Sequence, residues 1–298
     1  MATNFASRQG EYRADELACM IAGHQPLIDG LGAAMAWPTY WNTELAPVLN
    51  NGALPGIAEG FARFTSVPNI YEQMQKGIEK QIQEAQANPY ESHPPLRDRI
   101  DAARKVSGEL VQEDSQPART LLDRPDALEL RFVEGANPDM KPGTLRCITW
   151  DEVGAKVTIP QWKKFAAEYS SFLEGVTAES LPVQIPKLPK IGSSMRDPKG
   201  MLLGPEQRRQ RAGNLFAVGL ALALIDRSWR LINEPGIFIL RGPKCELDPF
   251  LAVSGLIAGK LTADEWILRC RTLGVADLLL APATPQRVGL PGVEASTS

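Results

Sequence analysis

The sequence has few of the residues that usually build metal or redox sites. Its 298 residues include two histidines and four cysteines. The cysteines form no C-x-x-C pair, which excludes a thiolate zinc knuckle or a dithiol redox motif. Neither histidine is followed by glutamate, so the chain holds no H-E-x-x-H segment. We therefore expect reduced thiols and a cytoplasmic setting for this chain.

Strong net charge and long apolar runs are absent as well. The formal charge is −3, which gives no field to attract nucleic acid, so we expect no nucleic-acid partner. The first eight residues are short, polar and unlike a signal peptide. The longest uncharged apolar run, 212–225, falls short of the ~20 residues that cross a bilayer. We interpret this run as a buried helix, without a membrane span.

What the chain does have is the composition of a packed protein. Hydrophobic residues make up 44% and charged residues 22% of the sequence, as in ordinary globular domains. We predict a mainly α fold with a small α+β accessory domain that contains one β-hairpin. The expected divisions are a first domain at 1–110, a helical extension at 111–180, a linker or arm at 181–205, the accessory domain at 206–281 and a disordered tail at 282–298.

Helix start and stop signals recur along the chain. Apolar spacing predicts a first helix over 8–21 that ends near Gly23, and we assign His24 to its C-terminus. Pro94-Pro95 should open a helix over 96–106, because a proline in the first turn loses no intrahelical hydrogen bond. Further helices are expected at 57–87 in two stretches split near 66–69, at 124–129, after capping boxes at 149–152 and 262–265, and at 208–227, 248–258 and 263–273.

Two other segments carry distinct signals. Five prolines and three lysines between 181 and 205 predict an extended linker or an arm wrapped on a neighbour. Two apolar runs flank Asn-Glu-Pro-Gly at 233–236, which predicts a hairpin over 229–240.

Two carboxylates near the start of the chain are candidates for chemistry. Glu11 and Asp15 are four residues apart on the first helix, so both project from one face. This spacing suits one acid that binds a metal and another that steadies a neighbouring imidazole. The alternative is that both acids only complement the helix dipole. His93, beside prolines, is either a ligand or a loop residue hydrogen-bonded to backbone.

Two motifs resemble a known family. The run S-R-Q-G-E-Y-R-A-D at 7–15 is similar to the glutamate-ligand helix of HtpX-like and CAAX-prenyl-protease-like zinc metallopeptidases. The segment S-H-P-P-L-R-D-R-I at 92–100 resembles a later His-Pro segment of that family. The resemblance implies that Glu11 is the third zinc ligand and that Asp15 supports the site. It also implies that His93 faces the metal, as an oxyanion donor or a reversible ligand, with Arg99 nearby.

The missing H-E-x-x-H decides what the resemblance predicts for activity. A catalytic zinc of this type needs two imidazoles, a carboxylate and a glutamate base. We expect this chain to be a C-terminal fragment that does not hydrolyse peptides alone. One zinc ion would bind only with an upstream segment or second chain that carries H-E-x-x-H. The complete protein would be membrane-associated and act on peptide or protein substrates.

Two alternatives remain open at this point. The chain could be a degenerate, non-catalytic relative that works as a protein-binding module, using the 181–205 arm and exposed Trp37, Tyr40 and Trp41. It could also be an enzyme with a site that only folding assembles. No glycine-rich phosphate loop or G-x-S-x-G elbow supports that second alternative.

Overall fold

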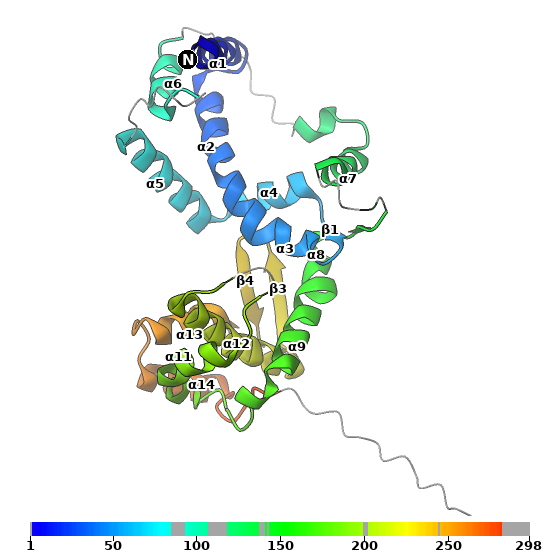
Figure 1. Ribbon diagram of the computed structural model, residues 1–298, viewed down its shortest axis with the longest axis vertical. Helices are drawn as coiled ribbons and strands as arrows, with labels where there is room; N and C mark the ends of the chain where they lie inside the picture. Colours follow the sequence, from blue (N-terminus) through cyan, green and yellow to red (C-terminus); the bar gives the residue numbers. More distant parts are fainter. Residues whose placement is uncertain are drawn as a thin grey trace, which may run out of the picture. The chain divides into compact units, whose positions relative to one another are not determined.

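The computed structural model describes residues 2–84, 93–106, 118–136, 141, 143–198, 202–243 and 245–281. The chain divides into two compact units (Figure 1). Unit 1 comprises Met1–Val157 with Asn233–Phe238, and unit 2 comprises Thr158–Ile232 with Ile239–Ser298. Both units are built mainly of helices, and the strands form one two-stranded and one three-stranded sheet among the described residues. The predicted fold class is therefore confirmed.

Unit 1 contains the elements that position the candidate site. Its helices are α1 (Ala2–Ala22), α2 (His24–Tyr40), α3 (Ala46–Leu49), α4 (Ile57–Ser66), α5 (Pro68–Glu84), α6 (Leu96–Ala103), α7 (Pro125–Ala136) and α8 (Trp150–Val153). Two short strands, β1 (Ala53–Leu54) and β2 (Arg146–Cys147), pair in parallel. Helix α1 packs against α2 and α6 (Figure 1). Neither the parallel pair nor the length of α2 was predicted from the sequence.

The junction of α1 and α2 corrects the interpretation of His24. Gly23 has a φ of 87°, a conformation that glycine adopts without steric cost, and it ends α1 as predicted. The chain then turns directly into α2, whose first residue is His24. Pro26 lies in the first turn of α2, where a proline is tolerated. The assignment of His24 to a helix C-terminus was therefore wrong.

An aromatic cluster forms the core of unit 1. Tyr40 is fully buried, and its hydroxyl donates to the carbonyl oxygen of Ile57 at 3.0 Å. The Trp150 indole nitrogen donates to the carbonyl oxygen of Gly56 at 2.7 Å. These bonds satisfy the polar atoms that the rings bring into the core. The prediction of Tyr40 as an exposed interface aromatic was wrong, because its ring packs against Phe64 and other aromatic side chains.

Unit 2 surrounds one long buried helix. Its helices are α9 (Ile159–Glu168), α10 (Leu181–Gln184), α11 (Leu188–Ser194), α12 (Pro205–Asp226), α13 (Pro249–Ile257) and α14 (Ala263–Leu273). Helix α12 packs against α9, α11 and α13 (Figure 1). Its buried residues run from Ala212 to Leu224 with one gap, which confirms the predicted buried helix. Among the described residues, no helix is long and apolar enough to cross a membrane.

The segment predicted as an extended linker is part of the unit 2 core. It forms α10 and α11, and Leu181, Leu188 and Met195 are buried. Helices α10 and α11 each have a proline in their first turn. A proline in this position does not break a helix, because the first turn needs no hydrogen bond from its nitrogen. Gly192 lies so close to the backbone of Arg208 that a Cβ would overlap it. In this segment the prolines therefore lie at the starts of short helices and do not make the chain extended.

The sheet of three strands confirms the predicted hairpin and extends it. Strands β3 (Arg230–Glu234) and β4 (Ile237–Arg241) flank a turn at Gly236, whose φ is 75°. A third strand, β5 (Glu246–Leu247), pairs antiparallel with β4 and sets Leu240 opposite Leu247. The predicted tail at 282–298 lies outside the described residues.

The four free cysteines differ in exposure, which predicts an order of reaction. Cys147 is exposed and Cys270 is buried. Burial raises the pKa of the Cys270 thiol to about 12, and the reactive species is the thiolate. We expect maleimide at pH 8 to label Cys147 long before Cys270, as followed by peptide mass spectrometry over time. The rates should converge in denaturant, and equal rates in the native protein would contradict the burial of Cys270.

Candidate functional site

The two candidate carboxylates project from α1 toward α6. Asp15 has 5% of its side chain exposed and Glu11 has 21%. Among the described residues, Asp15 is the one charged residue in the fully buried class. A buried carboxylate needs a charged or hydrogen-bonding partner, because desolvation alone costs several kcal/mol per ion. The partner of Asp15 therefore defines this site.

That partner is Arg99, in the first turn of α6. Its Nε donates to Asp15 Oδ2 and its Nη2 donates to Asp15 Oδ1, both at 2.8 Å. This two-pronged geometry is the strongest form of a carboxylate–guanidinium pair. These hydrogen bonds, which Arg99 donates to Asp15, raise the pKa of Arg99 above its ordinary value. The pair joins two helices whose residues lie 84 positions apart in sequence.

Glu11 lies one helical turn from Asp15 and contacts both His93 and Arg99. His93 Nδ1 is 2.5 Å from Glu11 Oε1, and Arg99 Nη1 is 3.0 Å from Glu11 Oε2. His93 itself is 76% exposed, at the start of the segment that leads into α6. We call Glu11, Asp15, His93 and Arg99 the α1–α6 cluster. All four residues that the sequence singled out are brought together here.

One oxygen of the cluster retains acceptor capacity. Glu11 Oε2 is buried and accepts no hydrogen bond from the described residues. Its contact with Arg99 Nη1 satisfies an ion-pair distance but not hydrogen-bond geometry. This oxygen is therefore held by the charge of Arg99 and not by a hydrogen bond.

The described residues do not by themselves fit a zinc ion. No group of three or more His, Cys, Asp or Glu side chains suited to a metal occurs in the described part of the chain. The α1–α6 cluster offers one carboxylate and one imidazole, which is short of the three protein ligands of a catalytic zinc. The guanidinium of Arg99 also neutralises part of the negative charge of Glu11. We therefore derive no catalytic step through zinc from this chain alone.

The roles inside the cluster differ from those expected from spacing. Asp15 was expected to steady an imidazole, but it binds Arg99, while Glu11 contacts His93. A sequence shows which residues share a helix face, but not which cation on another helix will reach which acid. His24, the first residue of α2, takes no part in the cluster.

A cavity adjoins the cluster between α1 and α6. It has a volume of about 570 Å³, and its lining includes Tyr12, Asp15 and Met20. Met20 is 54% exposed, so the cavity has an apolar side open to solvent. The buried ion pair therefore lies beside a space that another segment could enter.

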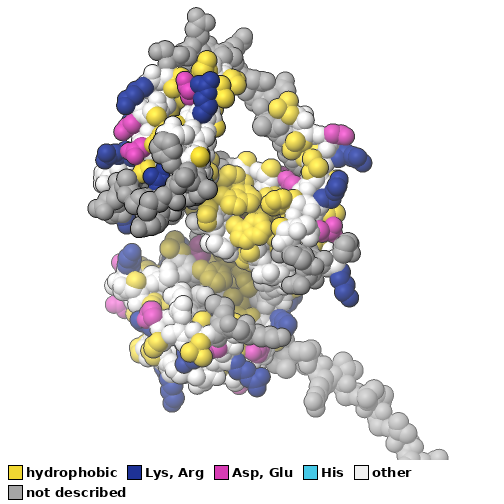
Figure 2. Space-filling view, turned by 45° about the horizontal axis from the view of Figure 1, so that its top comes forward, with side chains coloured by type: hydrophobic (Ala, Val, Ile, Leu, Met, Phe, Trp, Pro, Cys, Tyr) yellow, Lys and Arg dark blue, Asp and Glu magenta, His cyan; other side chains and the backbone are white. Residues whose placement is uncertain are grey.

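Unit 1 also contains an apolar groove that was not predicted from the sequence. Figure 2 shows hydrophobic side chains gathered on this face of the molecule. The groove has a volume of about 560 Å³ and is lined by Trp37, Phe61, Leu128 and Phe132 among others. Its acid, Glu129, is already occupied, because both of its oxygens cap the start of α4 at Ile57 N and Ala58 N. The spacing of Leu128 and Phe132 on α7 was the available signal.

No family model matches this chain, and no curated protein or solved structure matches it either.

Proposed function

We propose that this chain supplies the carboxylate ligand of a zinc metalloendopeptidase site of the HtpX-like type. The observation that carries the proposal is the α1–α6 cluster, in which two motifs more than 80 residues apart meet at Glu11. The H-E-x-x-H histidines and the general base would come from another segment or chain, since the sequence contains none.

The geometry supports distinct roles for the four residues. Asp15 and Arg99 hold α1 against α6, and this fixes the position of Glu11. Glu11 keeps a buried oxygen without a hydrogen-bond donor, which is the ligand atom in this proposal. His93 is exposed beside it and is placed to contact substrate or a reaction intermediate. Without the missing histidines, we expect no peptide hydrolysis by this chain.

The proposal is tested by supplying what the chain lacks. We would fuse an H-E-x-x-H helix of an HtpX-like peptidase before Met1 and measure bound zinc by titration against a chromophoric chelator. The fused protein should bind one zinc ion, whereas the chain alone should bind none tightly. Substitution Glu11→Gln should weaken binding about a hundredfold or more, since metal sites lose this much even when supporting residues are changed.

The matched control is Glu16→Gln on the same helix. Glu16 is exposed and pairs with Arg13 at 2.5 Å, so this variant should bind zinc as the unmodified fusion does. Equal zinc binding by the two variants, or none by the fusion, would contradict the proposal. A stable, monodisperse chain without zinc dependence would instead favour the second candidate function.

That second candidate is a non-catalytic protein-binding module. The apolar groove favours it, because Phe132 is 59% and Leu128 is 43% exposed while the one acid in the lining is already bound. Exposed apolar patches rimmed by polar residues are typical of protein interaction sites. The 181–205 segment no longer supports this candidate, since it belongs to the unit 2 core.

A further inference from the structure

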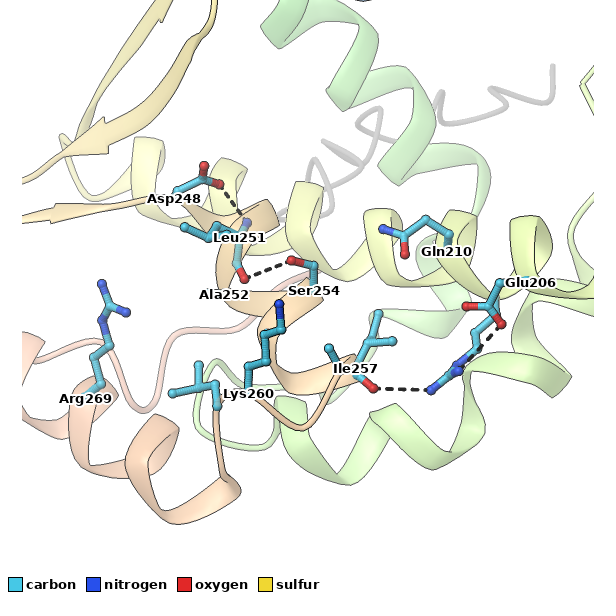
Figure 3. Close-up of a pocket in the computed structure, with 13 residues that line it drawn as sticks. Glu206, Gln210, Asp248, Leu251, Ala252, Ser254, Ile257, Lys260 and Arg269 are labelled. Carbon is cyan, nitrogen blue, oxygen red and sulfur yellow. Dashed lines mark hydrogen bonds and ion pairs between the residues drawn. The ribbon is translucent and has the colours of Figure 1, made fainter. Parts of the chain in front are cut away.

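A further cavity lies wholly within unit 2, far in sequence from the residues of the proposed peptidase function. We call it the α13 pocket. It has a volume of about 620 Å³ and is formed by α12, α13, α14 and the turn that joins α13 to α14. Figure 3 shows the residues that line it. The pocket is large enough for a small organic molecule.

Three cationic side chains line this pocket. They are Arg209, Lys260 and Arg269. Within the described part of the chain, Lys260 and Arg269 have no side-chain hydrogen bond and no carboxylate within ion-pair distance. In Figure 3 the amino group of Lys260 points toward Ser254, and Arg269 extends from α14. These two cations are therefore available to a ligand.

Arg209 supplies an independent observation. Its Nε is buried and has no hydrogen-bond acceptor among the described residues. Its other nitrogens are held loosely, with Nη2 3.5 Å from the carbonyl oxygen of Ile257 and Nη1 3.6 Å from Glu206. Burial of an unpaired N–H is unfavourable. The Nε atom is closed to solvent, so an added anionic oxygen would bind at the loosely held Nη1 and Nη2 atoms.

The acids of the pocket do not cancel these cations. Asp248 Oδ1 accepts from the backbone nitrogens of Phe250 and Leu251 at 2.8 and 2.9 Å, which caps α13. The negative charge of Asp248 therefore interacts with the N-terminal end of the α13 dipole. Burial also raises the pKa of Asp248. Glu206 is 76% exposed, and its contact with Arg209 Nη1 is long, at 3.6 Å.

An apolar side completes the pocket. Leu251 is 70% exposed, and Ile257 and Leu261 also contribute to the lining. We propose that the α13 pocket binds a small organic phosphate, with its phosphate on Arg209, Lys260 and Arg269 and its apolar part against Leu251. Guanidinium groups match phosphate oxygens in geometry and charge. The pocket would serve as a ligand site distinct from the α1–α6 cluster.

The probe that tests this proposal is n-butyl phosphate, titrated into the full chain by calorimetry at low salt. We expect saturable binding with one site per chain. Lys260→Gln and Arg269→Gln should each weaken it about tenfold, the effect of losing one charge-assisted hydrogen bond. Lys163→Gln on α9, an exposed lysine outside the pocket, is the matched control and should bind as the wild type does.

Two further ligands separate the parts of the proposal. Inorganic phosphate should bind more weakly than n-butyl phosphate, and n-butylammonium should not bind. Equal affinity for inorganic and butyl phosphate would refute the apolar contact. Unchanged binding by Lys260→Gln and Arg269→Gln, or no saturable binding at millimolar concentration, would overturn the site. Neither result bears on zinc binding at Glu11.

Discussion

Replacement of Trp150 by alanine should unfold unit 1 at a much lower temperature than the wild type. Trp150 is 1% exposed, and its indole nitrogen donates to the carbonyl oxygen of Gly56. Removing such a ring leaves a cavity, which costs about 3–5 kcal/mol, while the Gly56 carbonyl keeps its hydrogen bond from Gly60 N at 2.9 Å. For a unit of this size, the melting temperature should fall by roughly 10 °C. Calorimetric scans would measure the unit 1 transition.

The packing around Trp150 allows two matched comparisons. Gly60 lies so close to the indole that an added Cβ would overlap its ring, so Gly60→Ala should also destabilise unit 1, through overpacking. Trp41→Ala removes a ring of the same type from a half-buried position in the same unit. Its effect should be less than half that of Trp150→Ala. Equal shifts for both tryptophans would show that Trp150 is not a central core residue.

Substitution Asp15→Asn should destabilise unit 1 by about 3 kcal/mol. The change preserves the shape of the side chain but removes the carboxylate that Arg99, whose side chain is 20% exposed, binds with two hydrogen bonds. Breaking one side of a buried ion pair costs about 3–5 kcal/mol, and the lower end applies because Arg99 retains Glu11 at 3.0 Å. Urea denaturation followed by circular dichroism would measure the free energy of unfolding.

A double-mutant cycle isolates the interaction between the two residues. Adding Arg99→Gln to Asp15→Asn removes the unpaired cation, so the double variant should lose less stability than the sum of the two single variants. Asp29→Asn is the control, since Asp29 is exposed and accepts a hydrogen bond from Gln25 on its own helix. Additive effects within about 0.5 kcal/mol would show that Asp15 and Arg99 are not coupled.

Local signals were sufficient for most helices of this protein. The capping box at Thr262 predicted the start of α14, and the structure shows Thr262 N donating to Glu265 Oε2 at 2.8 Å. Pro125 is the first residue of α7, which contains most of the helix expected at 124–129. Helix α12 begins at Pro205, three residues before the expected start at 208. Caps and first-turn prolines act on atoms within four residues. These helix starts can therefore be predicted from the local sequence alone.

The 181–205 segment shows where such signals mislead. Its prolines and lysines favour an extended chain by composition, but the apolar residues between them, such as Leu188 and Ile191, bury against α12. The free energy of that burial depends on a surface that no local window contains. The short strands β1 and β2 were missed for the same reason, since their partners lie more than 90 residues apart.

The sequence motifs identified the four candidate residues, but they did not predict which of these residues pair with each other. The sequence by itself determined that Glu11 and Asp15 share one face of a helix, because the period of the α-helix requires it. Only the tertiary structure decided that Arg99 binds Asp15 and that Glu11 contacts His93. The physical reason is that ion pairs form between groups whose distance is set by the packing of α1 on α6, a contact between segments far apart in the chain.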